Sequence, residues 1–548
     1  MAKKKKTYTV TKVNSIREVT ELAVKEAGDQ LAYRYKEKGS DDKIVDVTFK
    51  GFYDDVENLG SALTARGYGD AHIACVSANC YRYIVTYVSV LESAGVFVPV
   101  DAELPTNEML HVLNNSDSTV IFYSEKLESW MMENRESLPN VKCFVGIDRA
   151  EDDGDFLSFD KLLEEGSKLD RKEYDSLKSD EYDLKLLVYT SGTTGVAKGV
   201  MLTEHNLVSL VYYGPQVSTV YDTGLSVLPY HHTYEAVCDI LVALHMHVTL
   251  CINESLKKVQ KNMQLYKPAY MMVVPAFAEE FYSAIMRNIR KKGIEKQFNT
   301  LIKLSNGLRK VGIDMRRKFF KEIHENFGGK LKKLVCGGAP IRYEINKFFD
   351  DIGLILTGGY GITECSPLVC VNDENSNCCY SAGHKLDCIE WKIDAPDADG
   401  IGEICVKGDT VMKGYYKNPE KTAEVLKDGW FYTGDYGYIT PDDQLVITGR
   451  KKNIIVLNNG KNIYPEEIEN YIQDIDYISE VVVRGIKNDF GEETGLLAEV
   501  YMPEPHPIEE VTADIKKTLA DLPGYKKVSK VVIREIPFEK TSSRKIRR

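Results

Sequence analysis

The chain has 548 residues, 43% of them hydrophobic and 28% charged, with a formal net charge of −12. This composition is ordinary for a folded protein and excludes a wholly disordered chain. An acidic protein surface repels phosphate backbones, so we expect no nucleic-acid partner. Two basic stretches, residues 3–6 and 544–548, are typical of solvated tails.

Membrane-spanning and secretory segments are not expected. The longest apolar run, residues 269–278, reaches about half of the roughly 18 residues that a membrane-spanning helix needs. No apolar segment follows the N-terminal lysines, as a secretory signal would require. The twelve cysteines lack the spacing of a disulfide scaffold. We therefore expect a cytoplasmic protein with reduced thiols, and contact with a membrane surface remains open.

The first part of the chain alternates strands with helices. Apolar runs predict strands at 72–76, 96–100 and 119–123, and amphipathic patterns predict helices at 49–66 and 106–115. Such alternation is typical of a mostly parallel sheet with helices on both faces.

The same alternation continues towards the middle of the chain. A strand is predicted at 184–190, followed by a loop rich in Gly, Ser and Thr. Another is predicted at 331–336, ending in Gly337-Gly338-Ala339-Pro340, where the proline suits the first turn of a helix. A third strand, 354–357, ends in Gly358-Gly359.

Near residue 450 the pattern changes to a compact α+β unit. Its expected elements are a helix from Pro465, strands at 481–486 and 496–502, a helix at 508–519 and a strand at 528–536. About 100 residues suffice for a small independent domain. We predict an entry segment (1–44), a large α/β domain of layered, mostly parallel sheets (45–449) and a small α+β domain joined by a hinge (450–548).

The densest chemical signal is the segment 189–199, YTSGTTGVAKG, directly after a predicted strand. Glycines let the backbone bend towards an anion, hydroxyls and amides donate hydrogen bonds, and Lys198 supplies a mobile positive charge. The spacing does not fit the P-loop motif, and Gly359-Tyr360-Gly361 lacks the third glycine of a dinucleotide fingerprint. A hydroxyl-rich surface turn is the structural alternative.

Several segments together resemble the adenylate-forming superfamily, which includes acyl-CoA synthetases, peptide-synthetase adenylation domains and firefly-type luciferases. Besides 189–199, they occur in the family's order: Gly337-Gly338-Ala339-Pro340, Gly359-Tyr360-Gly361-Ile362-Thr363-Glu364, Tyr432-Thr433-Gly434-Asp435, Gly449-Arg450 and a final Lys545. The resemblance covers roughly residues 45 to 548. It implies an enzyme that uses ATP and Mg²⁺ to activate a carboxylic acid as its acyl-adenylate and passes the acyl group to a thiol, coenzyme A.

The resemblance also implies roles for single residues. Tyr360 would stack on adenine, Thr363 would contact the α-phosphate, and Glu364 would hold Mg²⁺, because a hard cation takes carboxylate oxygens. Alternatively, Glu364 is an acid at a helix start. Two sets would bind the rest of the nucleotide: the phosphate-loop residues Thr190, Ser191, Gly192, Thr193, Thr194, Gly195 and Lys198, and the adenine-site residues Gly338, Ala339, Pro340, Gly359 and Gly361.

The C-terminal matches complete this implied site. Asp435 would accept both ribose hydroxyls, although Gly434-Asp435 alone is typical of a turn. Arg450 would help to hold the ribose or phosphates, and Lys452 falls at the family's interdomain hinge. Lys545 would stabilise charge on the α-phosphate. Arg544 stands where the family has glycine, and glycine reaches φ > 0 far more readily than arginine.

The identity of the acid is less well defined. The segment 228–235 resembles the family's acid site, with His232 near the substrate carboxylate; the alternative is an ordinary core histidine. Glu235 could hold an α-ammonium, as an aspartate does in amino-acid-activating relatives. The His-x-x-Glu pattern instead resembles long-chain acyl-CoA synthetases, which favours a medium- to long-chain fatty acid. Two further alternatives are an adenylation enzyme that loads a carrier protein and a degenerate adenylate-binding protein.

Overall fold

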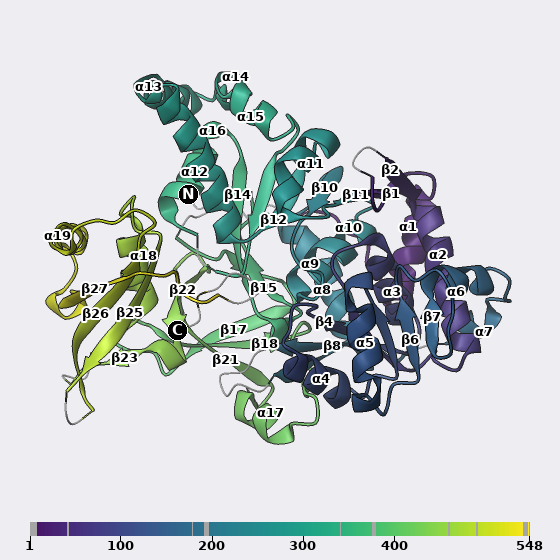
Figure 1. Cartoon of the computed structure of the whole chain (residues 1–548). Helices are drawn as coiled ribbons and strands as arrows, with labels where there is room; N and C mark the ends of the chain where they lie inside the picture. The colour runs from purple at the N-terminus through teal and green to yellow at the C-terminus, as the bar shows by residue number, and fades with distance from the viewer. Residues whose placement is uncertain are drawn as a thin grey trace. The chain divides into compact units, whose positions relative to one another are not determined.

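Figure 1 shows the computed structural model of the chain. The residues that it describes are 8–40, 43–177, 179–190, 197–339, 341–374, 380–458, 461–488, 491–540, 546 and 548. The chain divides into two units, Met1–Glu390 with Lys407–Phe431 and Trp391–Val406 with Tyr432–Arg548. The predicted boundary near residue 450 and the hinge at Lys452 fall inside the second unit and stay predictions.

One sheet of the first unit is built on parallel strands from the N-terminal third of the chain. Strands β3 to β8 run parallel, and the pairs β8–β9 and β9–β19 are antiparallel. The order is β19 (Gly414–Tyr415), β9 (Lys198–Thr203), β8 (Leu184–Thr190), β4 (Val96–Val100), β3 (His72–Val76), β5 (Val120–Tyr123), β6 (Cys143–Gly146) and β7 (Phe156–Ser158). Their near-continuous apolar sequences are typical of strands buried on both faces.

The second sheet of this unit is also parallel at its centre. Antiparallel pairs lie only at its ends among the described strands, at β1–β2, β14–β15 and β15–β16. The order is β16 (His384–Lys385), β15 (Leu368–Val371), β14 (Ile355–Gly361), β13 (Lys333–Cys336), β12 (Tyr270–Val273), β10 (Thr223–Ser226), β11 (Thr249–Ile252), β1 (Leu31–Lys36) and β2 (Ile44–Thr48).

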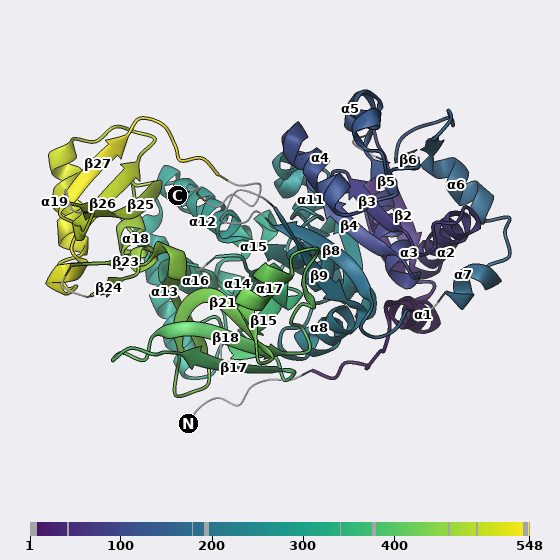
Figure 2. The same cartoon turned by 90° about the horizontal axis from the view of Figure 1, so that it is seen from below.

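Helices pack around both sheets of the first unit (Figures 1 and 2). The N-terminal helices are α1 (Ile16–Ala27), α2 (Phe49–Ala65), α3 (Tyr81–Glu92), α4 (Thr106–Asn115), α5 (Glu128–Asn134), α6 (Phe159–Gly166), α7 (Lys172–Ser176) and α8 (Glu204–Val217). The later ones are α9 (Thr233–Glu235), α10 (Val242–His245), α11 (Val259–Tyr266), α12 (Pro275–Lys291), α13 (Glu295–Lys310), α14 (Arg316–Phe319), α15 (Lys321–Asn326), α16 (Tyr343–Ile352) and α17 (Pro419–Val425).

Local sequence fixes several helix ends. Thr203 caps α8 by accepting from the Asn206 backbone N–H, while the Asn206 side chain accepts from the Thr203 N–H. This reciprocal pair satisfies two backbone donors that a helix start leaves free. At the other end of a helix, α16 stops at Gly353, whose φ of +85° suits glycine better than any residue with a Cβ.

The rest of the chain contributes one five-stranded sheet and a C-terminal group of strands and helices. Strands β17 (Ile389–Asp394), β18 (Gly402–Gly408), β21 (Trp430–Ile439), β20 (Leu426–Lys427) and β22 (Leu445–Arg450) form one sheet. The C-terminal part has β23 (Ile455–Val456), β24 (Asn462–Ile463), α18 (Pro465–Gln473), β25 (Glu480–Lys487), β26 (Glu493–Tyr501), α19 (Ile508–Thr518) and β27 (Lys530–Arg534). Its hydrophobic core joins Ile468 and Ile472 of α18 to Val481 and Val483 of β25.

The predicted fold, layered α/β sheets with a small α+β C-terminal part, is confirmed. The strands expected at 72–76, 96–100 and 184–190 have these bounds in the structure. Several other predicted bounds differ by a few residues, and two of the differences concern the glycine-rich segments. Strand β14 continues to Gly361 instead of ending before Gly358, because Gly359 and Tyr360 pair with β15. Helix α16 starts at Tyr343, later than Pro340 suggested. No helix within the described ranges is long and apolar enough to cross a membrane.

Candidate functional site

The side chains of Lys198, Tyr415 and Glu364 meet at the end of the predicted phosphate loop. Thr190, the last residue of β8, pairs in register with Lys198, the first residue of β9. The Lys198 Nζ lies 5.4 Å from the centre of the Tyr415 ring. The Tyr415 hydroxyl donates to Glu364 Oε1 at 2.9 Å. A cation and a carboxylate that lie far apart in the sequence are therefore held on either side of one tyrosine.

Burial and the neighbouring charge of Glu364 raise the pKa of Tyr415 well above its ordinary value. The phenol therefore keeps its proton and remains a donor to the carboxylate at neutral pH. Because its ring also faces Lys198, Tyr415 limits the positions that both charged groups can take.

The turn that carries Thr363 and Glu364 is fixed by close backbone contact. The Ile362 N–H donates to the Pro367 carbonyl oxygen at 2.8 Å. A Cβ on Gly361 would lie 1.9 Å from that oxygen, so only glycine fits there. The Met412 N–H donates to the Glu364 carbonyl oxygen at 2.9 Å, which ties this turn to the segment leading into Tyr415.

Two glycine-rich segments lie at neighbouring strand ends. Strands β13 and β14 are parallel, and Cys336 pairs in register with Gly358. Gly338, with a φ of +87°, therefore follows one strand end beside the stretch Gly359–Gly361 of the next. Tyr360 in this stretch is 7% exposed. The structure thus brings together the described residues of the predicted adenine site: Gly338, Ala339, Gly359, Tyr360 and Gly361.

The predicted acid segment touches the same strand end through Tyr234. Its hydroxyl donates to the Val335 carbonyl oxygen at 2.8 Å, and a Cβ on Gly337 would lie 2.9 Å from its ring. His232 lies two residues earlier, at the start of α9, and its ring centre is 4.3 Å from that of His231. The acid segment and the glycine turn after β13 are therefore neighbours in space.

His231 is weakly basic. Burial lowers the pKa of His231, although Asp101 lies 3.6 Å from its Nε2 and opposes the shift. A neutral imidazole is thus expected beside His232 at neutral pH.

Glu235 lies in the protein core. Its side chain is fully buried and accepts from the Ser226 hydroxyl at 2.5 Å. Burial, and then the nearby Asp239, raise the pKa of Glu235 well above its ordinary value. Asp239 in turn accepts from the Tyr270 hydroxyl at 2.8 Å. The buried surroundings of Glu235 therefore favour its neutral form over the anion that an ammonium ligand would need.

The second unit holds three other predicted residues close together. Asp435 of β21 is 3% exposed, and its Oδ1 lies 2.9 Å from Nε of Arg450, its register partner on β22. Lys452 follows in the next turn. Burial, and then the charges of Arg450 and Arg548, lower its pKa.

Some predicted residues lie outside the described part of the chain. They are Ser191, Gly192, Thr193, Thr194, Gly195, Pro340 and Lys545. Their roles stay predictions, as does any shared site between Asp435 and the residues of the first unit.

A family profile described as AMP-binding enzyme matches residues 20–416. The chain belongs to the AMP-binding enzyme family. The predicted enzyme class, an AMP-forming acid–thiol ligase whose members use ATP, Mg²⁺ and coenzyme A, is thereby confirmed at the level of the family.

Similar proteins fit this assignment. The chain is 29% identical to long-chain-fatty-acid–CoA ligase 5 of Rattus norvegicus, covering 94% of this chain and 79% of the rat protein. It is 27% identical to the chloroplastic long-chain-fatty-acid–[acyl-carrier-protein] ligase AEE15 of Arabidopsis thaliana, covering 88% and 76%.

Solved structures show the same fold. An anthranilate CoA ligase in complex with anthranoyl-AMP superposes with a TM-score of 0.77 at 17% identity, over 97% of this chain and 95% of that one. A Mycobacterium tuberculosis fatty acyl CoA synthetase gives 0.66 at 21%, over 97% and 96%.

The residues present fit a magnesium ion. Mg²⁺ in nucleotide sites is commonly held by one or two carboxylates together with substrate phosphates. Glu364 is half-buried and hydrogen-bonded through Oε1 to Tyr415, so its carboxylate is held at the hydroxyl of the ring that Lys198 contacts. Such an ion, when bound, neutralises charge on the phosphates.

Sequence reasoning missed Tyr415 as a member of the site, and it placed Tyr234 in the acid segment without foreseeing its contact with the strand end. Each acts through a partner distant in the sequence, Glu364 and Val335 respectively. A tyrosine in an apolar segment carries no local signal for such contacts. The only hint for Tyr415 is the preceding Gly414, where a Cβ would lie 2.8 Å from Thr422.

Proposed function

We propose that this protein joins a medium- to long-chain fatty acid to coenzyme A through an acyl-adenylate. In the first half-reaction the acid's carboxylate oxygen attacks the α-phosphorus of ATP, and pyrophosphate leaves. In the second, the thiolate sulfur of coenzyme A attacks the acyl carbon, and AMP leaves. Such transfers depend mainly on positioning and on stabilising charge.

The cluster of Lys198, Tyr415 and Glu364 is the observation that carries this proposal. Lys198 would bind the outer phosphates with Thr190, and Glu364 would hold Mg²⁺. Tyr360 would face adenine between the glycine turns of β13 and β14. The contact of Tyr234 with Val335 supports an acid site next to the nucleotide, because a short path between them is what the first half-reaction needs.

The C-terminal residues would complete the reaction. Asp435, oriented by Arg450, would accept the ribose hydroxyls. Lys545 would stabilise the charge that develops on the α-phosphate. A single pose of the small domain cannot serve both half-reactions, so it would turn about Lys452 between them.

The burial of Glu235 supports a fatty acid over an amino acid as the substrate. A carboxyl group that is fully buried and whose anion is disfavoured there is a poor partner for an α-ammonium. The names of the rat and Arabidopsis relatives, both long-chain-fatty-acid ligases, point the same way.

A panel of straight-chain acids from C2 to C18, read by pyrophosphate release, tests the substrate. We expect the highest kcat/KM among the medium and long chains. Octanoate and 2-aminooctanoate form a matched pair that differs only in the ammonium group, and we expect octanoate to be preferred by at least about 100-fold. Equal use of both would contradict the assignment of Glu235.

The acceptor is tested separately. Acyl-adenylate formed on the enzyme is offered coenzyme A or a purified holo acyl carrier protein, and the thioester is measured. We expect coenzyme A to be the faster acceptor. Preference for the carrier protein would favour a function like the one named for the Arabidopsis relative.

A further inference from the structure

A strongly basic segment lies away from the nucleotide residues. Residues 287–321 hold twelve Lys or Arg and only two Asp or Glu, a formal net charge of +10, although the whole chain has −12. The segment covers the end of α12, all of α13 and α14, and the start of α15. These helices form one end of the first unit in Figure 1. The proposed reaction gives this charge no role.

Helix α13 concentrates the lysines on one exposed face. Lys296, Lys303 and Lys310 are seven residues apart, which places them on the same side of a helix over about 21 Å. On the opposite side, Phe298 is buried and its ring centre lies 5.3 Å from that of Phe320. Aromatic packing thus fixes which face of α13 points to solvent, and that face is cationic.

Apolar side chains stand beside these lysines. Leu304 is 53% exposed, Val311 71% and Ile313 49%. Leu304 directly follows Lys303 within α13, and Val311 directly follows Lys310 at the end of the helix, so each lies about 100° around the helix axis from that lysine. Exposed aliphatic groups among cations are unfavourable in water and suit the boundary between lipid headgroups and acyl chains.

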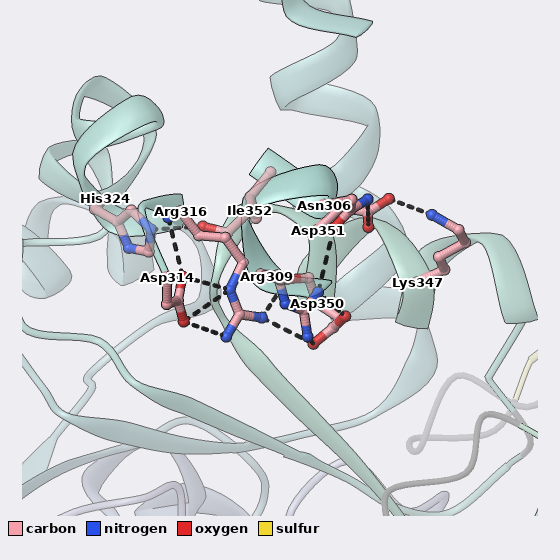
Figure 3. A network of polar contacts seen from close by, with 9 residues as sticks. All are labelled: Asn306, Arg309, Asp314, Arg316, His324, Lys347, Asp350, Asp351 and Ile352. Atoms are coloured by element: carbon pink, nitrogen blue, oxygen red, sulfur yellow. Dashed lines mark hydrogen bonds and ion pairs between the residues drawn. The ribbon is translucent and has the colours of Figure 1, made fainter. Parts of the chain in front are cut away.

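The loop after α13 is held in place by a network at its base (Figure 3). Arg309 precedes the loop and Arg316 follows it, and both bind the Asp350 carboxylate, at 2.7 and 2.9 Å. Arg316 also binds Asp314 at 2.7 Å, and this hydrogen bonding lowers the pKa of Asp314 to about 2. Both carboxylates, Asp314 and Asp350, therefore form ion pairs with these arginines.

Four exposed lysines of the basic segment have no ion-pair partner among the residues that the structure describes. Among the described residues, no carboxylate lies within ion-pair distance of Lys296, Lys303, Lys310 or Lys318. All four are exposed.

We propose that α13 and the loop 311–315, here called the basic helix surface, dock on a bilayer that contains anionic lipids. The lysines would contact lipid phosphates while Leu304, Val311 and Ile313 enter the headgroup boundary. A row of cations about 21 Å long, with apolar groups beside it, matches a flat anionic surface with an apolar layer beneath. The arginine network presents the loop in a fixed position, so little ordering is needed on docking.

Vesicle sedimentation of the full-length protein tests this surface. The vesicles are phosphatidylcholine alone or phosphatidylcholine with phosphatidylglycerol at 3:1. We expect binding to the anionic vesicles only, and its loss in 0.5 M NaCl. Each lysine at an anionic surface contributes about a factor of five, so Lys303→Gln with Lys310→Gln should weaken binding about 25-fold. Val311→Ser with Ile313→Ser should weaken it at low salt as well.

A matched control is Lys126→Gln with Lys142→Gln, which removes the same charge from exposed lysines elsewhere in the first unit. We expect this variant to bind vesicles like the unchanged protein, and both lysine pairs to leave octanoate activation in solution unchanged. Equal binding to neutral vesicles, or equal loss in the control, overturns the proposal. So does binding of acyl carrier protein through Lys303 and Lys310 without any binding to anionic vesicles. The vesicle-binding outcomes are independent of whether the fatty acid assignment holds.

Discussion

Removing one hydroxyl tests the arrangement around Glu364. In Tyr415→Phe the ring still faces Lys198, but Glu364 loses the donor that lies 2.9 Å from its Oε1. A hydrogen bond to a charged group contributes about 1.5–3 kcal/mol. Because Glu364 is half-buried, we take the lower end, about 1.5 kcal/mol, which corresponds to roughly a tenfold change in an equilibrium constant.

We expect this loss to appear in the magnesium dependence of the reaction. The assay is pyrophosphate release at saturating ATP and acid, titrated with Mg²⁺, and the half-saturating concentration should rise about tenfold. Tyr416→Phe is a matched control, because its hydroxyl donates to another carboxylate, Asp117 Oδ2, at 2.7 Å. An unchanged titration in Tyr415→Phe, or an equal shift in Tyr416→Phe, would refute the reasoning.

Three further predictions concern other parts of the chain. Gly361→Ala should lower the thermal midpoint and activity together, because its Cβ would lie 1.9 Å from the Pro367 oxygen. Gly307→Ala in α13, which has open space around it, should instead stabilise the protein by about 0.5–1 kcal/mol. Equal thermal midpoints of the two variants would contradict this reasoning. Burial, opposed by Arg17, raises the pKa of Glu92 to about 8 from an ordinary 4.5. The folded state therefore holds a proton that the unfolded state releases, and the free energy of unfolding falls as pH rises through this window. Glu92→Gln should flatten this fall between pH 5 and 8 by on the order of 1–3 kcal/mol, and an identical pH dependence of the melting curves would count against it. Lys545→Ala should slow acyl-adenylate formation at least about 100-fold while supplied acyl-adenylate still reacts with coenzyme A, and equal loss of both steps would exclude the proposed role.

The fold followed from sequence where local signals were strong. Apolar runs bounded by polar turns gave β3, β4 and β8 their observed ends, because parallel strands in a two-sided core need continuous apolar sequence. The strand β14 was predicted too short, since its last residues are glycines and a tyrosine that are fixed by pairing with β15. Long-range pairing of this kind has no signature in the segment itself.

Site residues could be predicted where they belong to one continuous sequence motif. Contacts between residues that lie far apart in the sequence could not. Lys198 and Glu364 were found through the motifs that contain them. Their connection through Tyr415 was not, because it depends on β19 lying beside β9. The burial of Glu235 was also missed, since its surroundings come from Ser226 and Asp239, which only the folded chain brings to it.

The C-terminal hydrophobic cluster has a consequence for evolution and for engineering. Within the part of the chain that the structure describes, every residue of this cluster falls between Ile455 and Val528. One uninterrupted stretch thus supplies a complete interior of its own. A gene segment that begins just before codon 455 would therefore carry this whole cluster across a single junction, without dividing it between two parents.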